Sequence, residues 1–412
     1  MQILYNVGIR CISGLITIAG LFNRKAKQFV SGRKGWLKKL QQKFSNETKP
    51  VIWMHCASLG EFEQGRPVLE ALRKHYPEHR LLLTFFSPSG YEVRKNYNGV
   101  DYVSYLPWDT RTNARAFVNT VKPVLAIFVK YEFWFHFSNT LRNANVPLIS
   151  ISSIFRSDQS FFKGYGGWYR SILGNFSWFF VQNEKSVSLL KGIGIENCTL
   201  AGDTRFDRVY EIVQRREPIA AAERFKAGQK LMVAGSCWHE DLDVLAPLIN
   251  EQRLKFIIAP HEVAESSVSH IEKSLTVRTI RFSEISDKNP EEYDVLIVDN
   301  VGMLSKLYHY GEFAYVGGAF GKGLHNILEA ACYGIPVFFG NKAFGKFQEA
   351  VDLINLGGAF DVADYPDLRK KYEMLNEPEN FMLACEVTRR YVEDNLGATN
   401  KIMKYCRTIL DA

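Results

Sequence analysis

A carboxylate at the start of a predicted helix is the first candidate for chemistry in this chain. In HCASLGEFEQGRPVLEALRKHYP, residues 55–77, a strand leaves a sheet, turns at Gly60 and enters a helix with Glu61 in its first turn. The partial positive charge of a helix N-terminus stabilises a carboxylate there. Acidic residues are favoured at helix starts in any protein, so position alone leaves a catalytic and a structural role open for Glu61.

A glycine-rich segment between two predicted strands is the strongest local signal. Residues 316–340, VGGAFGKGLHNILEAACYGIPVFFG, read as strand, loop, helix and strand. The glycines let backbone amides approach a ligand, and a helix predicted to begin near Asn326 offers free N–H groups to a phosphate. Glu329 can accept hydrogen bonds from a ribose diol. The spacing matches neither GxGxxG after a first strand nor GxxxxGK[ST], which argues against a dinucleotide dehydrogenase and a P-loop NTPase. A plain tight turn is the structural alternative.

Charged and polar residues follow several other predicted strands. Lys130, Glu132 and Arg205 stand in the first half, where cations near a cleft can stabilise a departing phosphate or merely form ion pairs. His239 and His261 stand in the second half without HxxxH or HExxH spacing, so we expect them to form hydrogen bonds and expect no metal site. The segments are FVKYEFWF (128–135), GDTRFD (202–207), AGSCWHED (234–241), APHEVAE (259–265) and VDNVGML (298–304).

Two series of short apolar runs must position these residues. Runs that are nearly continuous in apolar residues are typical of parallel strands buried on both faces. With helical stretches between them, they predict two doubly wound α/β domains with a ligand cleft between the domains. The first series is 51–56, 81–86, 124–129, 147–152 and 178–182, and the second is 231–236, 255–260, 294–299, 313–318 and 336–340. A charged, helical stretch centred near 205–228 joins the series, and an amphipathic segment from about 380 to 412 is expected to pack back.

The positive charge of the chain is concentrated beside one apolar segment. Residues 1–46 hold nine of the 51 cations and no acid, which leaves 42 cations against 44 acids in the remainder. The globular body is therefore not basic, and we expect no nucleic-acid partner. Residues 3–22 are mostly apolar, but Asn6 and Arg10 make them marginal for a membrane span, and the cations that follow predict a body on the cytoplasmic side. A basic helix packed on the body is the alternative.

Length and composition agree with this organisation. A chain of 412 residues with 46% hydrophobic content predicts two or three domains with ample cores. Seven scattered cysteines, never spaced as CxxC, argue against a disulfide framework and structural zinc and are consistent with a reducing compartment.

Taken together, these segments resemble the 3-deoxy-D-manno-octulosonic acid (Kdo) transferases, which add Kdo to the lipid A precursor. The family's Ser-Val-Gly-Glu stretch is similar to SLGE at 58–61, and its Gly-Gly-His-Asn-Pro-Leu-Glu signature is similar to GLHNILE at 323–329. Further likenesses are SPSG (87–90), YLPWD (105–109), GDTRFD, VGGAF and GIPVFFG. The resemblance extends over essentially the whole chain.

The resemblance implies a GT-B glycosyltransferase of the inner membrane's cytoplasmic face. Its donor is CMP-Kdo, its acceptor is the lipid A precursor, an anionic membrane surface is a further partner, and it requires no metal or other cofactor. By this likeness the domains are an apolar and basic segment (1–46), an N-terminal acceptor domain (47–208) and a C-terminal donor domain (209–412).

The resemblance also implies roles for single residues. Glu61 is the general base that takes the proton of a glucosamine 6-hydroxyl, in a reaction that inverts the anomeric centre. A helix terminus lowers the pKa of such a carboxylate, while burial raises it. Arg205 stands where relatives commonly have Lys and is expected to stabilise the departing phosphate. The positions that bind the nucleotide are Pro260, His261, Val301, Gly302, Met303, Asn326, Ile327, Leu328 and Glu329.

Two positions depart from the family pattern. Relatives carry Glu-Thr-Glu where this chain has Lys130, Tyr131 and Glu132, so either Glu132 performs the electrostatic task or the acceptor site differs. Ile327 replaces a Pro, which costs little at a helix's first turn. Two other readings stay open at this point, namely a GT-B transferase with a UDP-sugar donor and a non-catalytic membrane scaffold.

Overall fold

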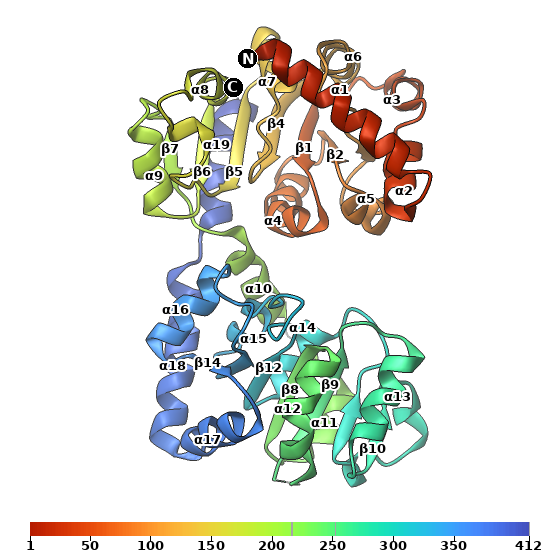
Figure 1. Ribbon diagram of the computed structural model, residues 1–412, viewed down its shortest axis with the longest axis vertical. Coiled ribbons are helices and arrows are strands. Elements are labelled where there is room, and N and C mark those ends of the chain that lie inside the picture. Colours follow the sequence, from red (N-terminus) through yellow and green to blue (C-terminus); the bar gives the residue numbers. More distant parts are fainter. Residues whose placement is uncertain (216, 252, 412) are drawn as a thin grey trace. The chain divides into compact units, whose positions relative to one another are not determined.

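The computed structural model describes residues 1–215, 217–251 and 253–411 (Figure 1). The chain forms two compact units. Unit 1 comprises Met1–Asp207 and Leu396–Ala412, and unit 2 comprises Arg208–Asn395.

Unit 1 is built on a parallel sheet of seven strands in the order β3-β2-β1-β4-β5-β6-β7. The apolar runs form its central strands because their side chains are buried on both faces of the sheet. The strands are β1 (Val51–Cys56), β2 (Arg80–Phe85), β3 (Tyr102–Tyr105), β4 (Pro123–Val129), β5 (Leu148–Ser153), β6 (Trp178–Val181) and β7 (Cys198–Leu200).

Helices lie on both faces of this sheet (Figure 1). The last helix, α19, packs its Ile402, Met403 and Cys406 into the same core as α4. The helices of unit 1 are α1 (Gln2–Ala19), α2 (Arg24–Gly32), α3 (Trp36–Phe44), α4 (Leu59–His75), α5 (Pro88–Arg94), α6 (Arg111–Val121), α7 (Phe135–Asn143), α8 (Gly167–Leu173), α9 (Glu184–Lys191) and α19 (Ala398–Leu410), with a 3₁₀ turn η1 (Ser160–Phe162). The boundary between the units falls within α10 (Thr204–Arg215).

Unit 2 repeats this architecture with a second parallel sheet in the order β10-β11-β9-β8-β12-β13-β14. Its strands are β8 (Leu231–Cys237), β9 (Lys255–Pro260), β10 (Thr279–Arg281), β11 (Val295–Ile297), β12 (Phe313–Val316), β13 (Val337–Gly340) and β14 (Ala359–Val362). Its helices are α11 (Ala220–Lys226), α12 (His239–Asn250), α13 (Glu265–Ser274), α14 (Leu304–Leu307), α15 (Leu328–Ala331), α16 (Gln348–Leu356), α17 (Tyr365–Asn376) and α18 (Pro378–Asp394), with 3₁₀ turns η2 (Phe282–Asp287), η3 (Pro290–Glu292) and η4 (Tyr308–Tyr310).

Each sheet has a point where the strand order reverses, and ligands of open α/β sheets bind beside the carboxyl ends of the strands there. In unit 1 the reversal lies between β1 and β4, and in unit 2 it lies between β8 and β12. Glu61 follows β1, Glu132 follows β4, and the glycine-rich segment follows β12. The topology thus brings the candidate residues of each unit to its own switch point.

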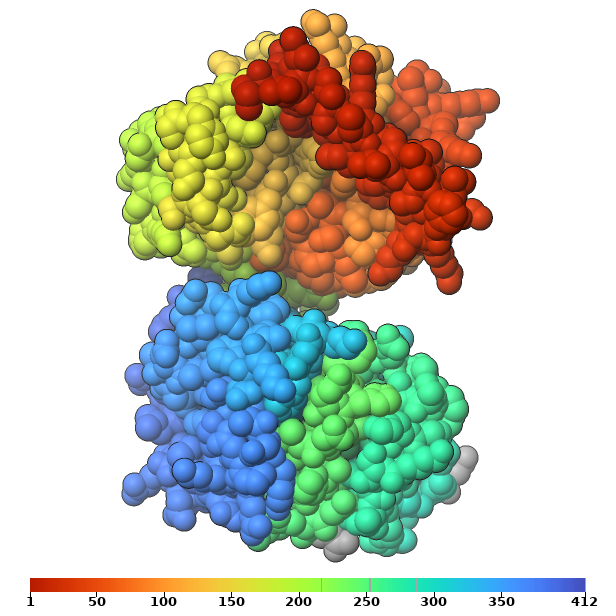
Figure 2. Space-filling view, in the orientation of Figure 1, coloured from red at the N-terminus to blue at the C-terminus, as the bar shows by residue number. Residues whose placement is uncertain are grey.

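The N-terminal helix α1 lies on the surface of unit 1 (Figure 2). The hydroxyl of Tyr5 donates to the carboxylate of Asp109, and Asn6 bonds the ring of His136. Burial raises the pKa of Asp109 to about 6, against the hydrogen bonds that it accepts from Tyr5 and from α7. By length and hydropathy α1 is suited to cross a membrane, and only 6% of it is buried in the protein. Its exposed apolar residues are Ile3, Leu4, Val7, Ile12, Leu15 and Ile18.

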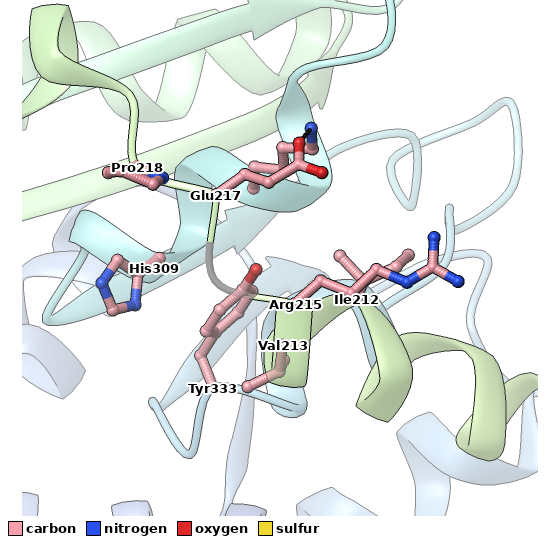
Figure 3. Close-up of a pocket in the computed structure, with 8 residues that line it drawn as sticks. Ile212, Val213, Arg215, Glu217, Pro218, His309 and Tyr333 are labelled. Carbon is pink, nitrogen blue, oxygen red and sulfur yellow. Dashed lines mark hydrogen bonds and ion pairs between the residues drawn. The ribbon is translucent and has the colours of Figure 1, made fainter.

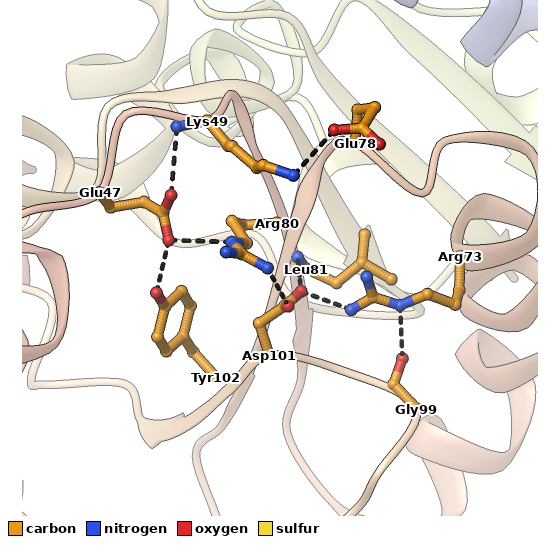
Figure 4. Close-up of polar contacts among 9 residues, drawn as sticks. All are labelled: Glu47, Lys49, Arg73, Glu78, Arg80, Leu81, Gly99, Asp101 and Tyr102. Carbon is orange, nitrogen blue, oxygen red and sulfur yellow. Dashed lines mark hydrogen bonds and ion pairs between the residues drawn. The ribbon is translucent and has the colours of Figure 1, made fainter.

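An ion-pair network ties the segment after α3 to the outer strands of the unit 1 sheet (Figure 4). Glu47 accepts hydrogen bonds from Arg80 and Tyr102, and Arg80 also pairs with Asp101. Asp101 in turn pairs with Arg73 of α4. Buried Arg33 holds α2 in a similar way, since it donates to backbone carbonyls and lies against aromatic rings, and burial lowers its pKa to about 9. The basic segment is therefore an integral part of unit 1.

Candidate active site

Glu61 occupies the third position of α4, where the SLGE sequence forms a capping box. The backbone N–H of Ser58 donates to Oε2 of Glu61 over 3.0 Å, which fixes the carboxylate at the helix N-terminus. Burial raises the pKa of Glu61 to about 7, with a further contribution from the charge of Glu132. The hydrogen bonds at the helix start and the nearby Lys130 act in the opposite direction but are outweighed. Such a carboxylate is suited to exchange a proton near neutral pH.

Glu132 and Lys130 lie with Glu61 at the switch point of unit 1, as their mutual electrostatic effects show. Glu132 is buried, and its Oε2 accepts hydrogen bonds from Nε1 of Trp134 at 2.7 Å and from Nε2 of His55 at 3.0 Å. Lys130 adopts a left-handed backbone conformation with φ of 64°, which costs about 1 kcal/mol or more in a residue with a side chain. Strain of this kind is concentrated at functional sites.

Arg205 lies in the first turn of α10 in unit 1. Its guanidinium donates to Asp203 at 2.8 Å, and Asp203 also accepts from Gln64 of α4 at 3.1 Å. The ion pair orients Arg205, and it leaves the side chain 24% exposed. The GDTRFD sequence therefore positions one cation and, through Asp207, caps the start of α19 at Gly397.

In unit 2 a buried aspartate holds the glycine-rich segment against the end of β8. Asp241 accepts hydrogen bonds from the backbone of Gly318 and Trp238 and from the hydroxyl of Tyr315, each within 2.9 Å. A Cβ at Gly317 would lie 2.4 Å from a backbone oxygen, so the close approach of the two loops requires glycine there. Burial raises the pKa of Asp241.

Three aromatic rings stack beside this loop. The ring of His261 lies 4.3 Å from that of Trp238 and 4.4 Å from that of His325, centroid to centroid. Nε1 of Trp238 donates to Nε2 of His325 over 3.3 Å. Burial, together with the nearby His261, lowers the pKa of His325 to about 4, so its ring is neutral at pH 7 and carries its proton on Nδ1. This stack brings predicted His261 next to the 326–329 segment.

The 326–329 segment differs from expectation in one respect. The helix predicted to begin near Asn326 is the single turn α15, which begins at Leu328. Asn326 instead bonds both the backbone of Leu328 and the carboxylate of Glu329. Burial raises the pKa of Glu329, against the hydrogen bond from Asn326 and the charge of Arg208.

The other residues predicted to bind the nucleotide differ in how exposed they are. Ile327 and Leu328 are fully buried, so their side chains belong to the core of unit 2. Val301 is 83% exposed, and Gly302 has a φ of 93° that favours glycine. Pro260 ends β9, which pairs with β11, the strand before the 301–303 loop. The structure therefore collects Pro260 and His261 beside the 326–329 segment and places the 301–303 loop on the neighbouring strand.

Unit 2 contains two cavities, and the smaller one borders these segments. A cavity of about 50 Å³ is lined by Trp238, Pro260 and Glu262 among others. A larger one, of about 300 Å³, includes none of the predicted site residues in its lining (Figure 3). That lining consists of Ile212, Val213, Arg215, Glu217, Pro218, Lys306, His309 and Tyr333. Among the described residues, no group of three His, Cys, Asp or Glu side chains is arranged to hold a metal ion.

Several residues that shape the site were missed by the sequence analysis. His55 is a buried strand residue, and Asp241 and Trp238 belong to the quoted 234–241 segment without having been singled out. Buried polar side chains at the ends of predicted strands were the available signal, because such groups need partners.

Comparison with known proteins shows which family the sequence of this chain resembles. Residues 30–208 match the model of the 3-deoxy-D-manno-octulosonic-acid transferase (kdotransferase) family. The 3-deoxy-D-manno-octulosonic acid transferase of Aquifex aeolicus is 30% identical over 78% of this chain and 85% of that protein, and the one of Rickettsia bellii is 26% identical over 88% and 87%.

Solved structures agree on the fold. The UDP-GlcNAc 2-epimerase of Neisseria meningitidis, bound to UDP-GlcNAc, is 14% identical, with a TM-score of 0.59 over 86% of this chain and 98% of that chain. MurG of Acinetobacter baumannii is 10% identical, with a TM-score of 0.55 over 88% and 100%. The fold prediction of two doubly wound α/β domains is thereby confirmed as GT-B. The sequence relatives show that the chain belongs to the Kdo transferase family and is a glycosyltransferase.

Proposed function

We propose that this glycosyltransferase moves Kdo from CMP-Kdo to a 6-hydroxyl of the lipid A precursor in lipopolysaccharide biosynthesis, with inversion and without a metal. The observation that carries the proposal is Glu61, a carboxylate with a pKa of about 7 at the switch point of an α/β unit, in a chain of this family. A base is most effective when its pKa lies near the working pH.

The proposed step is a single displacement. Glu61 takes the proton of the acceptor hydroxyl while that oxygen forms a bond to the anomeric carbon of Kdo. The bond from that carbon to the phosphate oxygen breaks, and CMP leaves with the electron pair. Attack opposite to the leaving group inverts the anomeric centre. Ordered acid and base groups of this kind contribute about 10²- to 10⁴-fold in rate.

Unit 2 is proposed to hold the nucleotide. Glu329 is fixed by Asn326 and is suited to accept hydrogen bonds from the ribose, while the amides of the 301–303 segment and those of Asn326 and Glu329 are assigned to the phosphate. Arg205, oriented by Asp203, is assigned to the departing phosphate. Lys130 and Glu132 are assigned to the charge balance around Glu61. Since Arg205 and backbone amides are assigned to balance the negative charge of the phosphate, a chelator is expected to leave the rate unchanged.

The acceptor is proposed to reach the enzyme from an anionic membrane surface on the cytoplasmic side of the inner membrane. Exposed apolar residues of α1 favour the lipid, and the basic residues of α2 and α3 favour anionic head groups, at about 1 kcal/mol for each cation near the surface. Lys39 and Lys43 also line a cavity of about 500 Å³ with Trp36 and Tyr105. Burial and the adjacent Lys39 lower the pKa of Lys43, so a bound anion would be stabilising there.

Mass spectrometry of the product tests the proposal. The purified protein is incubated with a tetra-acylated lipid A precursor and either CMP-Kdo or UDP-GlcNAc. We expect the mass of one or more Kdo residues to be added only with CMP-Kdo, in the presence or absence of a chelator. Transfer from UDP-GlcNAc, or no transfer from CMP-Kdo to this acceptor, would overturn the proposal.

A further inference from the structure

A buried chain of hydrogen bonds crosses the unit 1 sheet and ends at Glu132. Nε1 of Trp53 donates to the hydroxyl of Thr84 over 2.8 Å, and that hydroxyl lies 2.9 Å from Nδ1 of His55. On its opposite edge, His55 reaches Oε2 of Glu132 over 3.0 Å through Nε2. The side chains of Trp53, Thr84 and His55 are all fully buried. These hydrogen bonds join neighbouring strands. Trp53 and His55 belong to β1, which pairs with β2, the strand of Thr84, and with β4, the strand before Glu132.

The direction of the bond to Glu132 follows when this carboxylate is charged. An ionised carboxylate only accepts, so Nε2 of His55 donates to it. On the other edge of the ring, the Thr84 hydroxyl can either donate to Nδ1 or accept from it, and the Thr84 carbonyl, at 3.2 Å, can accept. His55 can therefore keep its bond to Glu132 in either protonation state without turning its ring.

Glu132 in turn acts on Glu61. Burial raises the pKa of Glu61 most, and the charge of Glu132 raises it further. Lys130 acts in the opposite direction, and the neighbouring Cys56 thiol stays neutral because burial raises its pKa. The charge and the position of Glu132 thus contribute to the raised pKa of Glu61.

We propose that His55 is a positioning residue for the transfer reaction, which holds the Glu132 carboxylate in place beside Glu61. This inference rests on the proposed function through the role of Glu61 as the base. A His–Glu pair can also serve stability alone. In that case its loss would lower stability or turnover without changing the pH at which Glu61 ionises.

His55→Leu separates these roles. The change removes one of the two donors to Oε2 of Glu132, and a buried carboxylate with fewer donors is protonated more readily. Glu61 then loses the effect of a neighbouring charge and should ionise at lower pH, by about one pH unit or more. Glu132→Gln should shift the ionisation of Glu61 in the same direction, and the double variant should add little to either single change. His55→Gln keeps an N–H donor, so the ionisation midpoint of Glu61 should lie closer to the wild-type value than in His55→Leu.

The measurement is a carbon-13 NMR titration of the Glu61 carboxyl in full-length protein labelled at glutamate, with Glu61→Gln to assign the signal. The pH dependence of kcat/KM is recorded alongside. His136→Leu is the matched control, since this buried histidine bonds Asn6 and no carboxylate through its ring. We expect a lower midpoint in His55→Leu and the wild-type midpoint in the control. A wild-type midpoint in folded His55→Leu would overturn the proposal.

Two further variants separate a failure of this proposal from a failure to fold and from a wrong assignment of the base. If His55→Leu does not fold, Thr84→Val removes the hydroxyl from the other edge of the ring at similar volume. A smaller shift in the same direction is then expected, and an unchanged midpoint would overturn the proposal. Full activity in Glu61→Gln would instead contradict the base assignment, and would do so whatever the titration of the histidine variants shows.

Discussion

Asn326 donates a hydrogen bond from Nδ2 to Oε1 of Glu329 over 3.1 Å. The bond holds a nearly enclosed carboxylate, whose pKa is raised by burial, at the start of α15. The side chain of Ile327 between them is buried in the core, which fixes the backbone of the segment. The polar pair is thus held in place by its apolar neighbours.

Glu329→Ala should weaken the binding of CMP about tenfold or more, because the loss of a hydrogen bond to a charged group costs about 1.5–3 kcal/mol. Isothermal titration calorimetry with CMP measures the change. Glu379→Ala, at an exposed position of α18 in the same unit, is the control and should bind CMP as the wild type does. A wild-type affinity for CMP in Glu329→Ala would show that Glu329 does not bind the nucleotide.

Asp241→Ala should lower the free energy of unfolding by about 3 kcal/mol, because it leaves two backbone N–H groups and the Tyr315 hydroxyl without their buried acceptor. Asp241→Asn keeps an acceptor oxygen and should lose less. Urea unfolding followed by tryptophan fluorescence measures the difference. The exposed Asp243 of the same helix provides the control, and a loss in Asp241→Ala as small as that in Asp243→Ala would contradict the structural role.

Replacing Leu4, Leu15 and Leu21 together by Gln should reduce binding to vesicles that contain anionic phospholipid at least tenfold. These side chains are 66%, 66% and 77% exposed, and burial of each in lipid is worth about 1.5–3 kcal/mol. Co-sedimentation with vesicles measures the binding. The matched control replaces Met382 and Leu383 of α18, which are similarly exposed. If both variants bind as the wild type does, a different surface mediates membrane binding.

Glu61→Gln should stabilise the protein at alkaline pH. The folded-state pKa of about 7 lies above the ordinary value of 4.5, so ionisation of Glu61 costs folding free energy. The cost is absent below about pH 4.5 and complete above about pH 7, where it reaches up to about 3 kcal/mol. Gln keeps the capping box, so the gain should be visible in urea unfolding at pH 8 and smaller at pH 5. Glu184→Gln, in the first turn of α9, should show no such gain.

The inner strands of both sheets were predictable from the sequence, but the edge strands were not. The runs at 51–56 and 255–260 coincide with β1 and β9. Every residue of these strands is buried, because helices cover both faces of a parallel sheet, and a continuous apolar run is the sequence signal of such a strand. The edge strands β3, β7, β10 and β14 were missed, since each is partly exposed and therefore lacks a continuous apolar run.

The candidate site was predictable in position but not in its partners. The sequence placed Glu61 in the first turn of a helix, and the capping box of α4 confirms that local prediction, whereas the role of Glu61 as the base was implied by the family resemblance alone. Its raised pKa was not predictable, because it depends on burial and on Glu132, which is 71 residues away in the sequence. The single turn at α15 was also missed, because the apolar residues after Asn326 resemble the start of a longer helix.

The pH dependence of kcat/KM for Kdo transfer, in the wild type and in Glu61→Gln, tests the central claim most directly. If Glu61 is the base, the wild-type rate falls below a midpoint near pH 7, and the variant loses about 100-fold or more at pH 8 while its affinity for CMP is unchanged. A variant that keeps a rate within a few-fold of the wild type would contradict the account.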